Sequence, residues 1–171
     1  MKKPAPGEVL ELFGPQHVAS TDSPIGRLWI ESDGQRIIRL SFESPGRGRP
    51  GESKVLKEAV KQLQQYFNKK RKAFKLPIAE VGSPFRKALW EELNAIPFGR
   101  VKSYQELAEV IGGNARAVGG ACADNPVPII VPCHRVLASN GLLTGYLGGI
   151  WRKRWLLEHE GVLPKELFSE K

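Results

Sequence analysis

The sequence predicts an α+β protein in which a small N-terminal antiparallel sheet and one helix precede a mainly helical region with a helix-turn-helix. Three observations support this fold class. Residues 17–42 contain short strand-like runs separated by turn signals. A helical periodicity follows over residues 55–67, and strands followed by one helix indicate a small α+β module. After Ser83 the signals are mostly those of capped helices, so we expect domains over residues 1–83 and 84–171.

Turn residues mark the strands of the first domain. The segment Asp22-Ser23-Pro24-Ile25-Gly26 separates two strand-like runs, and Asp33-Gly34 predicts a hairpin turn into a third. In the segment that follows, apolar residues recur at intervals of four, which predicts a helix with one apolar face. These residues are Val55, Ala59, Leu63 and Phe67, and the expected strands are His17–Ser20, Arg27–Ile30 and Arg36–Phe42.

Capping signals mark the helices of the second domain. Ser83 is a candidate N-cap followed by Pro84 at the first helical position. Ser103 and Glu106 form a capping box that opens a helix through Ile111. The remaining helices are expected at 115–123, capped by Asn114, and at 152–160, ended by Gly161.

Composition excludes several classes of protein. The chain of 171 residues is 41% hydrophobic, which is enough to form a core. No run approaches the ~18–20 apolar residues of a membrane helix, so we expect no membrane partner. The two cysteines, Cys122 and Cys133, are too few for a disulfide framework. Because no apolar segment follows the basic N-terminus, we expect a cytoplasmic protein with reduced thiols.

The formal net charge of +8 favours a polyanionic partner such as DNA or RNA. The alternative is that the basic side chains only keep a small protein soluble. Residues 1–83 contain 15 Lys and Arg against 9 Asp and Glu, a net charge of +6, and the second domain contributes +2. The excess is concentrated between Lys54 and Lys75, where it is either a phosphate-attracting surface or a solvated face.

Two short helices joined by a glycine turn at Gly112 follow the plan of a helix-turn-helix. The second helix would present Ala115, Arg116, Gly119 and Gly120 outward. This face lacks the Asn, Gln and multiple Arg that read base edges, but its small residues allow close approach to a DNA backbone with one long cation to insert. The alternative is an ordinary helical hairpin packed in a core.

The pair Cys133-His134 has the sharpest chemistry in the chain. A free thiol has a pKa of about 8.5, and histidine can remove its proton near neutral pH. Adjacent side chains of an extended segment point to opposite sides, so the two could share a proton only through a bend or an intervening water. The alternatives are a small buried cysteine and a structural histidine. Cys122 lacks a neighbouring base, and we expect it to serve packing.

The segment Asn125–Val136 resembles the active-site signature of the O6-alkylguanine-DNA alkyltransferases. Further segments are similar to this family in the same order, and the similarity is continuous from Pro84 to about Val162. The first domain is similar in outline only, through Ser23–Gly26. The resemblance implies an RNase H-like first domain and a winged-helix-like second domain. The further segments are Ser103–Ala108, Arg116–Gly120, Thr144–Tyr146 and Trp155–Gly161.

The resemblance implies a DNA repair protein that flips O6-alkylguanine out of duplex DNA. Its alkyl group, mainly methyl, would pass irreversibly to Cys133, once per protein molecule. Double-stranded DNA is then the expected partner, with no cofactor or metal, and the protein is expected to act as a monomer.

The resemblance also assigns roles to individual residues. Cys133 matches the alkyl acceptor, His134 the base that deprotonates it through a water, and Glu160 the carboxylate that orients the histidine. Asn125 matches the residue that braces the active-site loop, and Tyr104 the phenol that donates a proton toward N3 of the flipped guanine. Arg116 matches the arginine that fills the vacated stack, with Ala115 and Gly119 beside it on the DNA-binding face. The guanine pocket would be formed by Tyr146 and the backbones of Val136 and Leu147.

Two departures from the family pattern are visible. The turn between Tyr104 and Arg116 is about two residues shorter than expected, and Leu147 is bulkier than the small residue expected after Tyr146. Two rival functions also remain. An alkyltransferase-like lesion binder would replace the acceptor cysteine, which is present here as Cys133. A helix-turn-helix transcription regulator would need a more polar reading face than the glycine-rich one predicted here.

Overall fold

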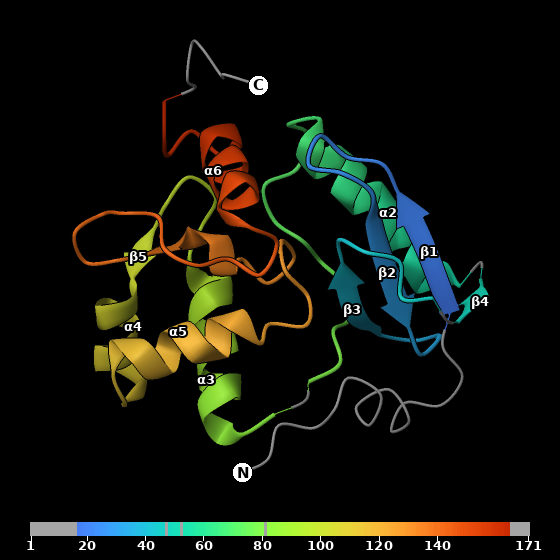
Figure 1. Cartoon of the computed structure of the whole chain (residues 1–171). Coiled ribbons are helices and arrows are strands. Elements are labelled where there is room, and N and C mark those ends of the chain that lie inside the picture. The colour runs from blue at the N-terminus through green and yellow to red at the C-terminus, as the bar shows by residue number, and fades with distance from the viewer. Residues whose placement is uncertain (1–16, 47, 52, 81, 165–171) are drawn as a thin grey trace. The chain divides into compact units, whose positions relative to one another are not determined.

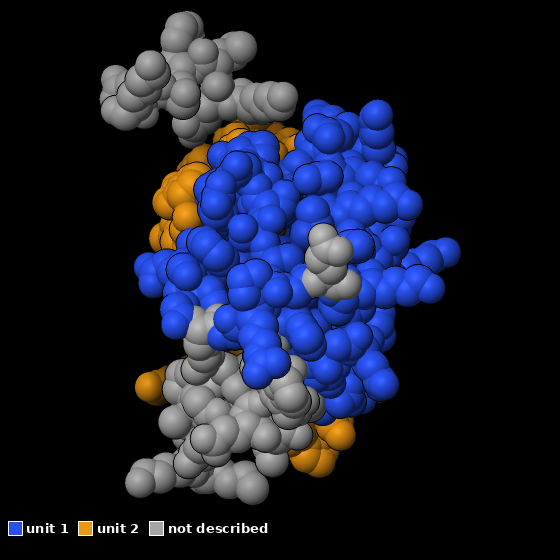
Figure 2. Space-filling view, turned by 90° about the vertical axis from the view of Figure 1, so that its right-hand side faces the viewer, with its two compact units in different colours: residues 1–80 blue, residues 81–171 orange. Residues whose placement is uncertain are grey.

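The computed structural model describes residues 17–46, 48–51, 53–80 and 82–164. The chain divides into two compact units, residues 1–80 and residues 81–171 (Figure 2). Over the residues that the structure describes, no helix combines the length and apolar character needed to span a membrane.

The sheet of the first unit is mixed rather than wholly antiparallel. Strands β1 (His17–Thr21), β2 (Leu28–Ser32) and β3 (Ile37–Ser41) pair antiparallel, within a residue or two of the expected ranges. A further strand, β4 (Arg49–Pro50), pairs parallel with β1, in the order β3-β2-β1-β4. β4 has two residues and therefore no alternation of apolar and polar positions to predict it. Proline is tolerated there because β4 lies at the edge of the sheet.

Helix α2 (Lys54–Phe67) packs against the sheet strands (Figure 1). The Ser53 Oγ caps it by accepting a hydrogen bond from the backbone N–H of Leu56. Val55, Ala59 and Leu63 are buried as the periodicity predicts. Phe67, the last residue of the periodic pattern, is half-buried, whereas its neighbour Tyr66 is fully buried. The reason is that a helical face advances by three or four residues and not by four at every step.

The second unit is mainly helical (Figure 1). The predicted N-caps of its helices are confirmed. The Ser83 Oγ accepts from the backbone N–H of Arg86, and Ser103 and Glu106 form the reciprocal capping box. The last helix begins two residues earlier than expected, at Ile150, and Glu160 is its C-cap rather than its last residue. The helices are α3 (Pro84–Ala95), α4 (Tyr104–Ile111), α5 (Ala115–Ala123) and α6 (Ile150–His159); a 3₁₀ turn, η1 (Cys133–Arg135), leads into β6 (Val136–Leu137), which pairs parallel with β5 (Lys102–Ser103).

Helices α4 and α5 form the predicted helix-turn-helix. Gly112 ends α4 with a φ of 89°, a left-handed conformation that favours glycine. Ala108 of α4 and Val118 of α5 are both buried in the helical unit. The opposite side of α5 is open: a Cβ atom at Gly120 would meet no heavy atom within 4 Å. The fold thus leaves one small-residue face of α5 available for a partner.

Candidate active site

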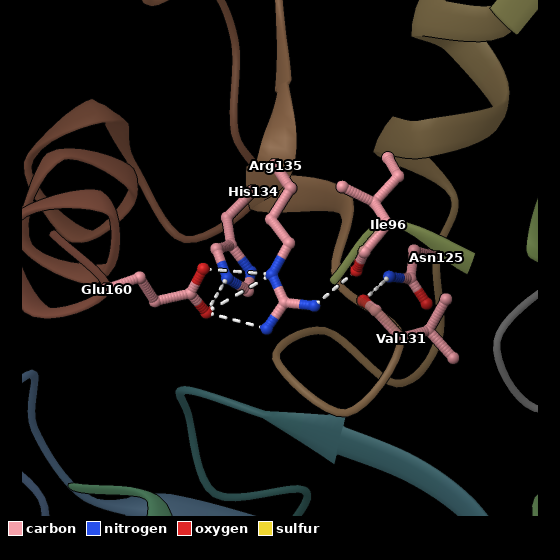
Figure 3. Close-up of polar contacts among 6 residues, drawn as sticks. All are labelled: Ile96, Asn125, Val131, His134, Arg135 and Glu160. Carbon is pink, nitrogen blue, oxygen red and sulfur yellow. Dashed lines mark hydrogen bonds and ion pairs between the residues drawn. The ribbon is translucent and has the colours of Figure 1, made fainter. Parts of the chain in front are cut away.

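Asn125 braces the loop that leads to Cys133. Its Nδ2 donates to the carbonyl oxygen of Val131 over 2.9 Å (Figure 3). Its Oδ1 accepts from the backbone N–H of Val127 over 3.0 Å. The backbone N–H of Cys133 donates to the same Val131 oxygen over 2.9 Å. Between them Ile129 adopts a φ of 73°, which is unfavourable for a β-branched residue. One buried side chain therefore ties both sides of a strained loop and connects it to the thiol.

Cys133 is a buried thiol with 3% of its surface exposed. Burial raises its pKa to about 11, while the Asn125 side chain and the positive charge of Lys153 act in the opposite direction. The thiol is consequently protonated at neutral pH in this state of the protein. A reaction at Cys133 requires a base close to it.

His134 and Glu160 form a buried pair of an imidazole and a carboxylate. His134 Nε2 lies 2.9 Å from Glu160 Oε1, and both side chains are fully buried. Burial lowers the pKa of His134, and the Glu160 carboxylate opposes this effect. A neutral imidazole with its Nε2–H donated to Glu160 keeps an acceptor lone pair on Nδ1. Among the described residues, that Nδ1 has no hydrogen-bond partner.

Arg135 neutralises the carboxylate from the other side. Its Nε and Nη2 donate to Glu160 over 2.9 and 2.8 Å, and its Nη1 donates to the carbonyl oxygen of Ile96 over 2.7 Å (Figure 3). Hydrogen bonds and charges of His134 and Arg135 lower the pKa of Glu160 to about 2, against its burial. Glu160 is thus a permanent anion at physiological pH, held at the end of α6 where the helix dipole disfavours it.

Tyr104 lies at the start of α4, with the buried Lys153 of α6 beside it. The Tyr104 hydroxyl donates to the carbonyl oxygen of Thr144 over 3.2 Å. Lys153 Nζ donates to Tyr104 Oη over 3.2 Å, to Thr144 O over 3.0 Å and to Gly145 O over 3.3 Å. Burial raises the pKa of Tyr104. These bonds hold the Thr144-Gly145 segment against the phenol.

The other expected site residues divide into two groups. Tyr146 is half-buried, with its hydroxyl oxygen buried, and burial together with negative charge at Cys133 raises its pKa. Val136 is buried, and its backbone N–H donates to Cys133 O. Leu147 is 42% exposed. The second group lies on α5, where Arg116 is exposed and Ala115 and Gly119 are half-exposed.

Sequence reasoning missed Arg135 and Lys153 as site residues. Lys153 shares the buried face of α6 with Leu156 and Leu157, at spacings of three and four residues. A lysine at a position where the helical pattern demands an apolar residue is uncommon, since lysine is almost never fully buried unless it is paired. That mismatch was the signal that would have identified it. Cys122 is buried on α5, as expected for a packing residue.

Two family models match the chain. The DNA-binding domain of 6-O-methylguanine DNA methyltransferase matches residues 84–162, and the ribonuclease-like domain of the same protein matches residues 17–79. A methylated-DNA–protein-cysteine methyltransferase of Shigella flexneri is 50% identical over 165 residues, covering 82% of this chain and 93% of that protein. This chain belongs to the O6-methylguanine DNA methyltransferase family.

Other members of the methyltransferase family agree in sequence and in structure. A constitutive enzyme of Bacillus subtilis is 38% identical over 162 residues, covering 88% of this chain and 98% of its own. The crystal structure of the Mycobacterium tuberculosis O6-methylguanine methyltransferase is 40% identical, with a TM-score of 0.78 over 89% of this chain and 97% of that one. A structure of Mycobacterium tuberculosis OGT in complex with DNA has a TM-score of 0.78 and 39% identity, over 87% and 96% of the two chains.

Proposed function

We propose that this protein repairs O6-alkylguanine in double-stranded DNA by transferring the alkyl group, mainly methyl, to its own Cys133. The observation that carries the proposal is the buried row of Cys133, His134, Glu160 and Arg135, in which a protonated thiol adjoins an oriented neutral histidine. Because the chain belongs to the methyltransferase family, we assign to these four residues the transfer of an alkyl group from methylated DNA.

Deprotonation of the thiol is the first step. His134 Nε2 is engaged by Glu160, so the proton of Cys133 passes to Nδ1, the nitrogen without a partner among the described residues. We assign the transfer to a bridging water molecule, because Cys133 and His134 are consecutive residues of the 3₁₀ turn η1, in which successive side chains point about 120° apart. The imidazolium that results lies against the Glu160 carboxylate, which stabilises its charge.

Alkyl transfer is the second step. The Cys133 sulfur forms a bond to the alkyl carbon, and the bond between that carbon and O6 of guanine breaks with its electron pair passing to the base. Tyr104 donates its phenolic proton to N3 of the guanine, which leaves neutral. The product on Cys133 is a thioether that no thiol or water readily reverses, so each molecule reacts once. The reaction as proposed uses no cofactor.

Helix α5 supplies the DNA contact. We place the small face formed by Ala115 and Gly119 against the DNA backbone and the exposed Arg116 in the minor groove, where its side chain fills the stack left by the flipped base. Tyr146, Val136 and Leu147 form the wall and rim of the guanine pocket. Both cysteines are free thiols, which suits the expected cytoplasmic location and a monomeric protein.

Mass spectrometry of the protein after incubation with duplex DNA containing O6-methylguanine tests this function. We expect one added methyl group, located on the peptide that contains Cys133, and stoichiometric loss of the lesion. A Cys122→Ser variant serves as a control and should react as the unmodified protein does. Binding of the lesion without any mass change, the behaviour of a lesion binder, would contradict the proposal.

A further inference from the structure

Lys153 is a fully buried cation to which the steps above give no role. It belongs to the buried residues of α6 together with Leu156 and Leu157, and its exposed fraction is 0%. Its three hydrogen bonds run to one phenol and two backbone carbonyl oxygens, and none of these acceptors is a carboxylate. A buried ammonium group without an anionic partner is costly, so a well-packed apolar residue would serve the fold better.

The hydrogen bonds of Lys153 determine where the phenolic hydrogen of Tyr104 points. An ammonium group donates and never accepts, so the bond from Lys153 Nζ occupies a lone pair of Tyr104 Oη. The phenolic hydrogen is then directed away from Lys153, and it is donated to Thr144 O. Lys153 bonds to the same Thr144 oxygen. When that hydrogen turns toward an entering base, Thr144 O keeps a donor, and no buried carbonyl is left unsatisfied.

The positive charge of Lys153 also acts on the groups on which negative charge develops. The groups that interact with it electrostatically are Cys133 of η1 and Cys122 of α5, and the phenol of Tyr104 on α4 lies under its ammonium group. Arg135 and Glu160 are bonded to each other, and Glu160 is also bonded to His134, so these two charges already compensate one another. Burial lowers the pKa of Lys153, and negative charge on either thiol raises it.

We propose that Lys153 is a positioning residue of the methyl transfer, holding Tyr104 as a hydrogen donor toward the leaving guanine and compensating the negative charge of its phenolate. The proposal rests on the function assigned above. In the transfer, the thiol proton goes to His134 and the phenolic proton goes to guanine N3. The imidazolium and the phenolate that remain are balanced by Glu160 and Lys153 respectively, and a proton returns from the imidazolium to the phenolate through solvent.

The test compares Lys153→Gln with Arg154→Gln, which removes the same charge from an exposed position of the same helix. Gln keeps an amide donor for the carbonyl oxygens but lacks the charge. The measurement is the single-turnover rate of Cys133 alkylation by the free base O6-benzylguanine, as a function of pH, so that DNA binding does not enter. Melting temperatures of both variants verify that they are folded.

For Lys153→Gln we expect a rate at neutral pH lower by on the order of 10²-fold, the usual effect of losing one preorganised electrostatic contact. The pH profile should move upward, because removing the cation raises the pKa of the Cys133 thiol. Arg154→Gln should react at the normal rate. In the Tyr104→Phe background, Lys153→Gln should slow the reaction much less than in the native background, since the two residues act as a unit.

A normal rate and profile for Lys153→Gln would overturn the proposal. So would a rate that is lower at every pH by the same factor and fully additive with Tyr104→Phe, which is the result of a structural role. Failure of the unsubstituted protein to alkylate Cys133 would refute the function itself and is seen separately, in the mass spectrum.

Discussion

His134 and Glu160, 26 residues apart in the chain, form a buried hydrogen bond of 2.9 Å between Nε2 and Oε1. The bond selects the imidazole tautomer, because Nε2 must carry the hydrogen and Nδ1 is left as the acceptor. It also places an anion at the end of α6, which Arg135 compensates. The tautomer of His134, the base that we propose for the reaction, and the stability of the helical unit therefore depend on the same carboxylate.

Substitution of that carboxylate by an amide, Glu160→Gln, should impair both properties. Arg135 would become a buried cation without its ion pair, at a cost of about 3–5 kcal/mol in the free energy of unfolding. The alkylation rate of Cys133 should fall on the order of 10²-fold, since the imidazolium loses its counter-charge. Urea denaturation and single-turnover kinetics measure the two effects, and a variant with native stability would contradict the ion-pair argument.

The same groups predict an acid-labile protein. The pKa of Glu160 is lowered from 4.5 to about 2, so the unfolded chain binds its proton first and stability is lost as the pH falls from 4.5 toward 2, by about 3 kcal/mol in total. The pKa of His134 is lowered from 6.5, so its contribution is complete above 6.5 and decreases below it. Urea denaturation at a series of pH values measures both decreases in stability. The decrease between pH 4.5 and 2 should be absent from the Glu160→Gln variant.

Asn125→Ala should destabilise the active-site loop. It removes two buried hydrogen bonds and leaves the N–H of Val127 without its acceptor, which costs about 1–3 kcal/mol for the unsatisfied group. The matched control is Asn140→Ala, which removes a similar side-chain bond to Leu142 N in an exposed turn and should change stability by less than about 0.5 kcal/mol. Equal decreases in the free energy of unfolding of the two variants would contradict the prediction that the buried bonds of Asn125 stabilise the protein more than an exposed bond does.

Arg116→Ala should separate base flipping from chemistry. Because Arg116 is exposed on α5, its truncation leaves the buried thiol network intact. We expect an unchanged rate with free O6-benzylguanine and slower repair of O6-methylguanine in duplex DNA. The reaction rates of the variant with the two substrates are measured in parallel. Equal decreases in rate with both substrates would refute a role of Arg116 that is specific to base flipping.

Two substitutions of Gly120 should change stability and DNA affinity separately. A Cβ at this helical position meets nothing within 4 Å, so Gly120→Ala should raise the free energy of unfolding by about 0.5–1 kcal/mol. Gly120→Glu should fold equally well but bind duplex DNA at least tenfold more weakly, because a carboxylate then faces the phosphates. Thermal denaturation and fluorescence anisotropy measure these effects. Native DNA affinity of Gly120→Glu would exclude this face from the interface.

Most of the secondary structure was predictable because its signals are local. Ser83, Ser103 and Asn114 each cap a helix through a backbone N–H three residues away, so the cap and its partner are visible in one short window. The pairing of β4 with β1 was not predictable, since two residues at a sheet edge carry no pattern. The full burial of Tyr66 in place of Phe67 depended on the exact turn of α2 over the sheet.

The sequence by itself determined the helices, the glycine turn, the thiol beside a histidine and the family resemblance. Each of these features depends on residues that are close together in the chain. Tertiary structure alone decided which groups meet. Lys153 reaches Tyr104 across 49 residues, and Arg135 divides its guanidinium between Glu160 and the carbonyl of Ile96. Such contacts depend on how α4, α6 and the loop before β6 pack together. The chemical environment of Cys133 is therefore a property of that packing, in which burial raises the pKa of the thiol and nearby charges oppose it.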